Sequence, residues 1–252
     1  MKLYKKDQHF LIDEKVLGRI IEYGQLNSSD TVLEIGAGYG NLTEKLARKA
    51  GKVIAIEADA ELASSLNRFN NVEVFIGDAL KLDFPYFNKV VSNLPYSISS
   101  PVTFKLLEYE FDMGILMYQY EFAKRMVAAP GSKDYGRLSI AVQYRANVQI
   151  MEVVPRLAFS APPEVNSAII RLIPRLRPYE VKDENFFMKF IRAAFSQRRK
   201  KLKKALLNNA AYLGITEETL KRLPPDIIDR RAETISPEEL AKLSDILFEE
   251  KI

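Results

Sequence analysis

The feature that most constrains the fold is a short strand that ends in closely spaced glycines. Thr31–Ile35 is rich in β-branched residues, and it is followed by the glycine-rich turn Gly36–Gly40 and by a helical stretch, Asn41–Ala47. A second strand, Lys52–Ile56, comes next. Glycines in such a turn allow a ligand to approach the backbone closely at a helix N-terminus. The order strand, glycine turn, helix, strand predicts an α/β fold that binds its ligand at the carboxyl ends of the strands.

Acidic residues follow the second and third predicted strands. Lys52–Ile56 ends in Glu57, and a third strand, Asn71–Ile76, is followed by Gly77 and Asp78. An acid at the end of the second strand accepts hydrogen bonds from ribose hydroxyl groups, and Asp78 is placed to meet an adenine amino group. We therefore predict an adenosine-bearing cofactor. A structural turn, with the acids as helix caps or solvated strand ends, is the alternative.

A polar loop follows the fourth predicted strand, Lys89–Val91. In this loop Asn93 offers both an acceptor and a donor, so it can recognise an exocyclic amine. Pro95 removes a backbone donor and leaves the carbonyl of Leu94 as a second acceptor. Tyr96 supplies a flat face on which a planar base can stack. The loop predicts chemistry on the amino group of a nucleobase, and a proline-containing loop with an unrelated asparagine is the alternative.

The composition excludes several kinds of site. The 252 residues include no cysteine, which excludes disulfides, thiol nucleophiles and thiolate metal sites. The single histidine, His9, excludes a multi-histidine site, and we expect no metal. No apolar run reaches the ~18–20 residues that span a membrane, so we expect a cytoplasmic protein without a membrane segment. The net charge of +4 and the pI of about 9.0 favour a polyanionic partner.

Several motifs can be compared, in order and spacing, with those of known families. They are Gln8–Leu11, Glu34–Gly40, Glu57, Gly77–Ala79, Asn93–Ser99, Met117–Met126, Tyr135–Ser139 and Phe195–Leu202. Together they resemble the rRNA adenine N6,N6-dimethyltransferases, the family that includes bacterial KsgA. His9, where bacterial members usually carry Asn, is more similar to the archaeal branch. The resemblance covers essentially the whole chain.

The resemblance implies a Rossmann-like class I methyltransferase sheet with S-adenosylmethionine as cofactor. It implies cofactor contacts at His9, Leu11, Gly36, Gly38, Glu57, Asp78 and Asn93. It implies that the target adenine meets Asn93, Leu94, Pro95, Tyr96 and Phe159. An unspecialised core phenylalanine is the alternative for Phe159, and Ala161 stands where the family usually has proline.

The implied activity is dimethylation of two adjacent adenosines near the 3′ end of small-subunit rRNA, within an assembling small ribosomal subunit. Hydrogen bonds from adenine N6 to the Asn93 side-chain oxygen and the Leu94 carbonyl favour a tetrahedral nitrogen whose lone pair faces the methyl group. The base must leave its stack, and stacking on Tyr96 and Phe159 offsets part of that cost. Nothing in the sequence indicates more than a monomer.

Two domains are predicted: a SAM-binding catalytic domain over residues 1–174 and a small α-helical RNA-recognition domain over residues 175–252. Two late strands, Val148–Val154 and Ala168–Ile173, are expected to form an antiparallel hairpin at the edge of the sheet. Beyond a proline-rich linker the pattern is helical. The expected helices cover about 183–196, about 199–213, Glu217–Arg222 and Pro237–Glu249.

A dense basic run begins the second of these helices, with six basic residues among the seven at 198–204. Such a run is often a solvated face, but beside a site that acts on a base it favours phosphate contacts with salt-dependent affinity. The predicted RNA-binding residues are Lys5, Lys6, Arg198, Arg199, Lys200 and Lys201.

Three alternatives stay open. Large-subunit rRNA adenine methyltransferases share the catalytic motifs, although their C-terminal part differs from the Phe195–Leu202 pattern. A non-catalytic nucleic-acid-binding relative would retain the fold without turnover. A nicotinamide dehydrogenase is disfavoured because the glycine spacing is G-x-G-x-G rather than G-x-G-x-x-G.

Overall fold

The computed structural model describes residues 9–250, and these form two compact units. The first unit contains the residues up to Ala123 together with Ala146–Pro174, and the second contains Lys124–Arg145 together with the residues from Arg175 onward. Each unit has its own buried apolar cluster. The predicted catalytic residues therefore lie in the first unit, and the predicted RNA-binding residues 198–201 lie in the second.

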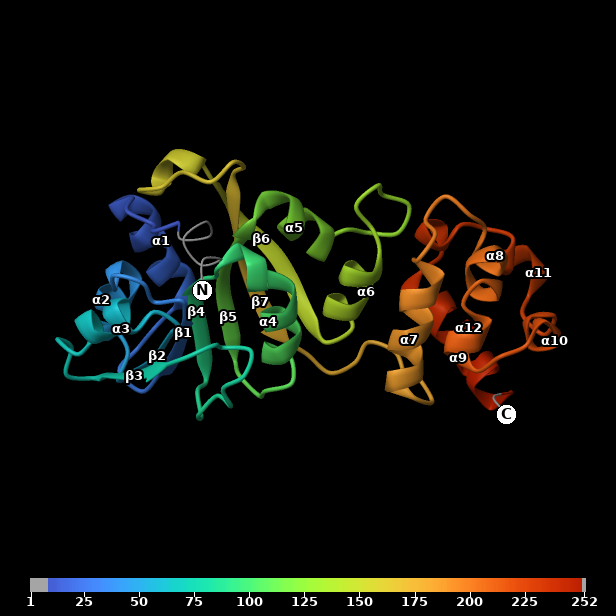
Figure 1. The fold of residues 1–252 in the computed structure, drawn as a ribbon, viewed down its shortest axis with the longest axis horizontal. Helices are drawn as coiled ribbons and strands as arrows, with labels where there is room; N and C mark the ends of the chain where they lie inside the picture. The colour runs from blue at the N-terminus through green and yellow to red at the C-terminus, as the bar shows by residue number, and fades with distance from the viewer. Residues whose placement is uncertain (1–8, 251–252) are drawn as a thin grey trace. The chain divides into compact units, whose positions relative to one another are not determined.

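The first unit is built on a seven-stranded sheet in the order β3-β2-β1-β4-β5-β7-β6 (Figure 1). The strands are β1 (Thr31–Ile35), β2 (Lys52–Glu57), β3 (Val72–Ile76), β4 (Lys89–Asn93), β5 (Met113–Gln119), β6 (Ala146–Val154) and β7 (Ser167–Pro174). The first five are parallel, and β7 is antiparallel to both β5 and β6. The predicted α/β sheet with an antiparallel edge hairpin is confirmed.

Helices connect and cover the parallel strands. They are α1 (Glu14–Gly24), α2 (Asn41–Ala47), α3 (Ala60–Leu66), α4 (Ser99–Leu106) and α5 (Tyr120–Met126). Asp13 caps the start of α1, because its carboxylate accepts hydrogen bonds from the backbone N–H groups of Lys15 and Val16. The apolar face of α1 packs against β4 and β5. Four of the five residues of β1 and five of the six of β2 are buried, as expected for parallel strands under helices.

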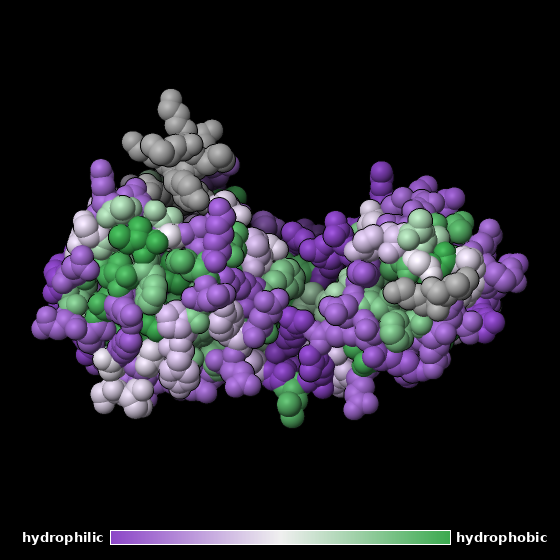
Figure 2. Space-filling model, turned by 60° about the horizontal axis from the view of Figure 1, so that its bottom comes forward, coloured by the Kyte–Doolittle hydropathy of each residue, from purple (hydrophilic) through white to green (hydrophobic). Residues whose placement is uncertain are grey.

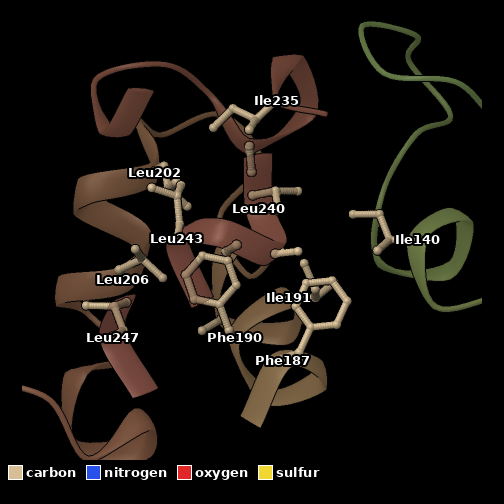
Figure 3. Packing of buried hydrophobic residues seen from close by; sticks show 14 of the residues in the cluster. Ile140, Phe187, Phe190, Ile191, Leu202, Leu206, Ile235, Leu240, Leu243 and Leu247 are labelled. Carbon is tan, nitrogen blue, oxygen red and sulfur yellow. The ribbon is translucent and has the colours of Figure 1, made fainter. Parts of the chain in front are cut away.

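The second unit is helical. Its helices are α6 (Arg137–Gln143), α7 (Glu184–Ala194), α8 (Leu202–Leu207), α9 (Ala210–Leu213), α10 (Glu217–Leu220), α11 (Pro225–Ile228) and α12 (Pro237–Glu249). Figure 3 shows Phe187, Phe190 and Ile191 of α7 facing leucines of α8 and α12. The side chains of Phe187, Phe190 and Ile191 are fully buried. Burial of about 150–250 Å² by each aromatic ring makes this cluster the main source of stability for the unit.

The structure corrects two predictions about the C-terminal part. The segment 124–145 was expected in the first domain, but it packs with the second unit because Tyr135, Ile140 and Tyr144 are buried in the same cluster as α7 and α12. The expected helix over about 199–213 is two short helices, α8 and α9. Residues 198–201 precede the first helical residue, Leu202, so the first four residues of the basic run lie outside the helix and only its last three begin α8.

Polar residues cover most of the surface that Figure 2 shows, with smaller apolar patches in each unit. Isolated exposed hydrophobic residues are ordinary on a folded surface. Within residues 9–250, no helix combines the length and apolar character needed to cross a membrane.

Truncation of one buried isoleucine in each unit tests the division at 124–145. Ile140→Ala should destabilise the second unit by about 2–5 kcal/mol, because Ile140 is 1% exposed. Hydrogen exchange should therefore accelerate in α7 and α12 while β1 and β4 stay protected. The matched variant Ile115→Ala, from an equally buried position in β5, should give the reverse pattern. Equal acceleration in both units after Ile140→Ala would contradict the assignment.

Candidate active site

A cavity of about 430 Å³ opens at the carboxyl ends of β1, β2, β3 and β4. It brings together ten of the predicted site residues from five segments of the chain. These are His9, Leu11, Gly36, Gly38, Glu57, Asp78, Asn93, Leu94, Pro95 and Tyr96. The cavity lies where an open α/β sheet places its ligand, because the strand order reverses between β1 and β4.

The glycine turn holds a backbone shape that side chains rarely adopt. Gly36 and Gly38 have φ angles of +76° and +56°. A Cβ atom on Gly36 would lie 2.9 Å from Cδ of Pro95, and one on Gly38 would lie 2.8 Å from the ring of Phe10. The turn therefore packs tightly against the Asn93–Tyr96 loop on one side and the N-terminal segment on the other. Glycine is needed there for both conformation and space.

The two predicted acids have different hydrogen-bond environments. Glu57 is 8% exposed, and its carboxylate accepts hydrogen bonds from the backbone N–H groups of Gly38 (2.8 Å) and Asp59 (2.9 Å). These bonds fix the carboxylate beside the glycine turn. Asp78 accepts one bond, from the N–H of Leu80 at 2.9 Å. Both carboxylates keep lone pairs that can accept further hydrogen bonds from a ligand.

Asn93 presents an unused acceptor. It is the last residue of β4, and its Nδ2 donates a hydrogen bond to the backbone oxygen of His9 at 3.0 Å. This bond fixes the orientation of the amide. Its Oδ1 is buried and has no hydrogen-bond partner among the residues that the structure describes. A buried acceptor of this kind costs free energy unless a ligand satisfies it.

The side chain of Tyr96 contacts both Ser167 and His9. The Tyr96 hydroxyl lies 2.5 Å from Oγ of Ser167 at the start of β7. The rings of Tyr96 and His9 lie 5.4 Å apart with an interplanar angle of 33°, and Nδ1 of His9 donates to the carbonyl of Ala161 at 2.7 Å. The His9 ring therefore supports the Tyr96 ring at the cavity.

Phe159 does not lie at the cavity, contrary to the prediction that it stacks on the target base. Its side chain is 2% exposed and packs in the core of the first unit with Leu11. The backbone explains the burial: Phe159 forms an antiparallel bridge with Leu11, and the N–H of Ser160 donates to the carbonyl of Phe10. The structure therefore favours the alternative, a core phenylalanine.

The structure describes four of the six predicted RNA-binding residues, and these four differ in their contacts. Lys5 and Lys6 lie outside the described residues. Arg198 donates to the backbone carbonyls of Lys133 (2.6 Å) and Tyr135 (3.2 Å) and contacts Glu233.

Lys201 forms an ion pair with Asp229 at 3.3 Å. All four side chains of residues 198–201 are exposed. Within the basic run, contacts with other segments of the second unit therefore engage Arg198 and Lys201.

Glu34 is a charged cavity residue to which the sequence analysis assigned no role. Glu34, the fourth residue of β1, is 2% exposed and lines the cavity. The sequence signal that could have identified Glu34 was the presence of one charged residue within the strand Thr31–Ile35. Among residues 9–250, no group of three or more His, Asp or Glu side chains is arranged to hold a metal ion.

Comparison with known proteins identifies the family. The family model described as "Ribosomal RNA adenine dimethylase" matches residues 3–237. The chain belongs to this family. It is therefore an S-adenosylmethionine-dependent enzyme that methylates adenine in ribosomal RNA, and the predicted resemblance is confirmed.

Relatives and solved structures agree with this family. The protein of Methanosarcina acetivorans named "Probable ribosomal RNA small subunit methyltransferase A" is 56% identical over 251 residues, which cover 97% of this chain and 93% of that protein. A similarly named protein of Thermococcus sibiricus is 45% identical, with coverage of 97% and 92%. The crystal structure of a dimethyladenosine transferase from Plasmodium falciparum superposes with a TM-score of 0.78 at 33% identity, covering 93% of this chain and 96% of that one.

The structure of the 23S rRNA methyltransferase ErmE gives a lower TM-score of 0.67 at 28% identity, with coverage of 95% and 99%. Both structures share the overall fold of this chain.

The residues of the cavity fit S-adenosylmethionine. Positive-φ glycines leave room for a ligand at the end of β1, and carboxylates with spare lone pairs end β2 and follow β3. Because the sheet order is β3-β2-β1-β4, Asp78, Glu57, Gly36 and Asn93 follow one another along its edge. An extended ligand that carries an adenine, a ribose and a charged chain can contact them in turn.

Gly36→Ala tests the glycine turn. The added Cβ would meet Pro95, and the positive φ adds about 1–2 kcal/mol of strain, so the variant should unfold at lower denaturant and bind S-adenosylmethionine more weakly. The control Gly18→Ala lies within α1, with no atom within 4 Å of the added Cβ. It should raise stability by about 0.5–1 kcal/mol. Wild-type binding by Gly36→Ala, measured by calorimetry, would contradict the tight packing.

Proposed function

We propose that this enzyme dimethylates N6 of two adjacent adenosines near the 3′ end of small-subunit rRNA, within an assembling small ribosomal subunit. The names of its relatives from Methanosarcina and Thermococcus support the small subunit as substrate. The observation that carries the proposed chemistry is the buried, unpartnered Oδ1 of Asn93 at the cavity. We further propose that it works as a monomer in the cytoplasm, where such subunits assemble.

The cofactor is held by the segments that end the parallel strands. Glu57 accepts hydrogen bonds from the ribose hydroxyls, and Asp78 accepts one from the adenine amino group. His9 and Leu11 close the cavity from the N-terminal segment, and their backbone stays in place because Asn93 Nδ2 and Asn41 Nδ2 donate to their carbonyls. S-adenosylmethionine supplies an activated methyl group, so neither a metal ion nor a covalent enzyme intermediate is part of the proposal.

The target adenine is oriented by two acceptors in the loop after β4. Adenine N6 is a poor nucleophile because its lone pair is delocalised into the ring. Asn93 Oδ1 and the carbonyl of Leu94 accept its two N–H bonds, and this favours a tetrahedral nitrogen with a localised lone pair. The acceptors are fixed before the base arrives, because Asn93 is already held by the His9 carbonyl. Their contribution is preorganised electrostatic stabilisation together with alignment.

Tyr96 provides the stacking surface. Its ring lines the cavity and is held by Ser167 and His9. Stacking of a flipped base on an aromatic ring is worth roughly 1–3 kcal/mol, which offsets part of the cost of unstacking. With Phe159 in the core, Tyr96 alone has this role.

Asn93→Ala tests the chemistry. Loss of a preorganised transition-state contact typically costs about 100- to 1,000-fold in rate, so methyl transfer should fall by that factor while the thermal transition shifts little. The control Asn67→Ala removes an exposed asparagine at the end of α3 and should transfer normally. Labelled methyl from S-adenosylmethionine is followed into unmethylated small subunits, with large subunits and naked RNA in parallel, and nucleosides are identified by mass.

The outcomes separate the candidate functions. Dimethyladenosine in small subunits alone supports the proposal. Label in large subunits moves the assignment to the ErmE-like activity. Cofactor binding without label in any RNA indicates a non-catalytic relative, and wild-type turnover by Asn93→Ala would remove the role assigned to that side chain.

RNA contacts are proposed for Arg199 and Lys200, the two exposed residues of 198–201 that lie between the ion-paired Arg198 and Lys201. Replacing Arg199 and Lys200 with Gln removes two phosphate contacts, so the slope of log affinity against log salt should fall by about 1.4 to 1.8. The matched control, Arg198→Gln with Lys201→Gln, removes the same charge but also internal bonds. It should lower the melting temperature and change the salt slope less. Equal slope changes in the two pairs would show that internal contacts do not restrict RNA binding.

A further inference from the structure

The turn that follows β3 is held by a lysine from another segment. Asp78, the proposed partner of the adenine amino group, begins this turn, and its backbone oxygen accepts hydrogen bonds from the N–H groups of Lys81 (2.9 Å) and Leu82 (3.1 Å). The Nζ atom of Lys105 donates to the carbonyl of Ala79 at 3.0 Å and also to the carbonyl of Leu82. Ala79 lines the cavity, so these bonds fix part of the cavity wall from behind.

Lys105 is itself held in place by an aromatic ring. Its Nζ atom lies 4.4 Å from the centre of the Phe84 ring, whose face attracts an ammonium group. Phe84 is buried, its ring lies 5.1 Å from that of Tyr109, and its backbone N–H donates to the Tyr109 hydroxyl at 3.1 Å. The ammonium group therefore meets two carbonyls and the face of a fixed ring, and it lacks the freedom of a solvated lysine.

The position of Lys105 in α4 connects two parts of the cavity. This helix begins directly after the loop that carries Asn93 and Tyr96, and Lys105 lies in its last turn. A positive charge is favoured at that end of a helix, where carbonyl groups lack intrahelical partners. The bonds to Ala79 and Leu82 thus link the loop proposed to hold the methyl acceptor, through α4, to the turn proposed to hold the cofactor's adenine.

Recognition of the adenine amino group depends on the position of the Asp78 carboxylate. Its Oδ1 accepts a hydrogen bond from the N–H of Leu80 at 2.9 Å, so the carboxylate moves with the turn. Hydrogen bonds weaken steeply as donor and acceptor lose their alignment. A shift of the turn would therefore weaken the bond to adenine. It would leave the carboxylate of Glu57 in place, because the N–H groups of Gly38 and Asp59 orient that side chain.

We propose that Lys105 is a positioning residue for adenine recognition. By holding the carbonyls of Ala79 and Leu82, it keeps the carboxylate of Asp78 aligned with the amino group of the cofactor's adenine. The proposal rests on the assignment of adenine to Asp78 made above. Lys105 acts through the turn and makes no contact with the cofactor or the methyl acceptor.

Two cofactor analogues that differ at position 6 of the purine isolate this role. S-adenosylhomocysteine carries an amino group there, and S-inosylhomocysteine carries an oxygen. The wild-type chain should bind the first at least about tenfold more tightly, because only its amino group donates to the charged acceptor Asp78. Lys105→Met keeps the apolar stem and removes the charge and the donors. Its affinity for S-adenosylhomocysteine should fall by about tenfold, while that for S-inosylhomocysteine changes little. Calorimetry measures both.

The methyl-transfer assay gives a second readout. In Lys105→Met the KM for S-adenosylmethionine should rise by about tenfold, while the rate at saturating cofactor stays close to that of the wild type. The matched control Lys81→Met removes an exposed lysine of the same turn and should keep the wild-type preference between the two analogues. If Lys105→Met does not fold, Lys105→Gln takes its place with the same expected pattern, because it also lacks the charge.

Equal weakening of both analogues in the lysine variant would show a merely structural role and would overturn the proposal. A wild-type preference, or a lower rate at saturating cofactor with an unchanged KM, would overturn it as well. Asp78→Ala tests the assignment on which the proposal rests: it should remove the preference by itself, and adding Lys105→Met should change little more. A wild-type preference in Asp78→Ala would overturn the placement of adenine. Loss of the preference in Asp78→Ala but not in Lys105→Met would overturn the role of Lys105 alone.

Discussion

Parallel pairing of β1 with β2 on one side and β4 on the other is the constraint on which the site depends. Parallel strands end at the same edge, so the residues after each strand meet there although they are far apart in the chain. The chain places β2 and β3 on one side of β1 and β4 on the other, so the strand order reverses between β1 and β4, and the cavity lies at that point. The glycine turn then lets the ends of β1 and β4 approach, since any side chain at Gly36 would strike Pro95.

Polar side chains at the two opposite edges of the sheet differ in whether their hydrogen-bonding atoms are satisfied within the chain. At the amino edge, Lys89 donates to Asp30 at 3.1 Å, and Asn88 donates to the other oxygen of Asp30 at 2.9 Å. Asp30 is buried, and these bonds satisfy its carboxylate within the first unit. At the carboxyl edge, Asn93 Oδ1 and Glu34 Oε2 are buried without a partner in the described chain. Unsatisfied polar atoms concentrated at one edge are the physical mark of a site whose partners come with the ligands.

The second unit shows why a charge run cannot be interpreted from composition alone. Arg198 spans the 133–135 segment and Glu233, and Lys201 is paired with Asp229. A guanidinium group that donates to backbone carbonyls helps to hold the segment 124–145 in this unit. The neighbouring Arg199 and Lys200 are exposed, as Arg198 and Lys201 are. Residues of one charge, adjacent in the chain, thus differ in whether they contact other segments of the second unit.

The sequence by itself determined the strands, the glycine turn and the residues that follow each strand, because hydrophobic runs and glycine conformations are local properties. It therefore predicted ten of the cavity residues and the edge hairpin. Only the tertiary structure decided the partners of each side chain, since these depend on segments distant in the chain. It placed Phe159 in the core through its bridge with Leu11, placed 124–145 with the second unit, and left Oε2 of Glu34 without a hydrogen-bond partner among residues 9–250. Burial and pairing are properties of the packed chain, and no local pattern contains them.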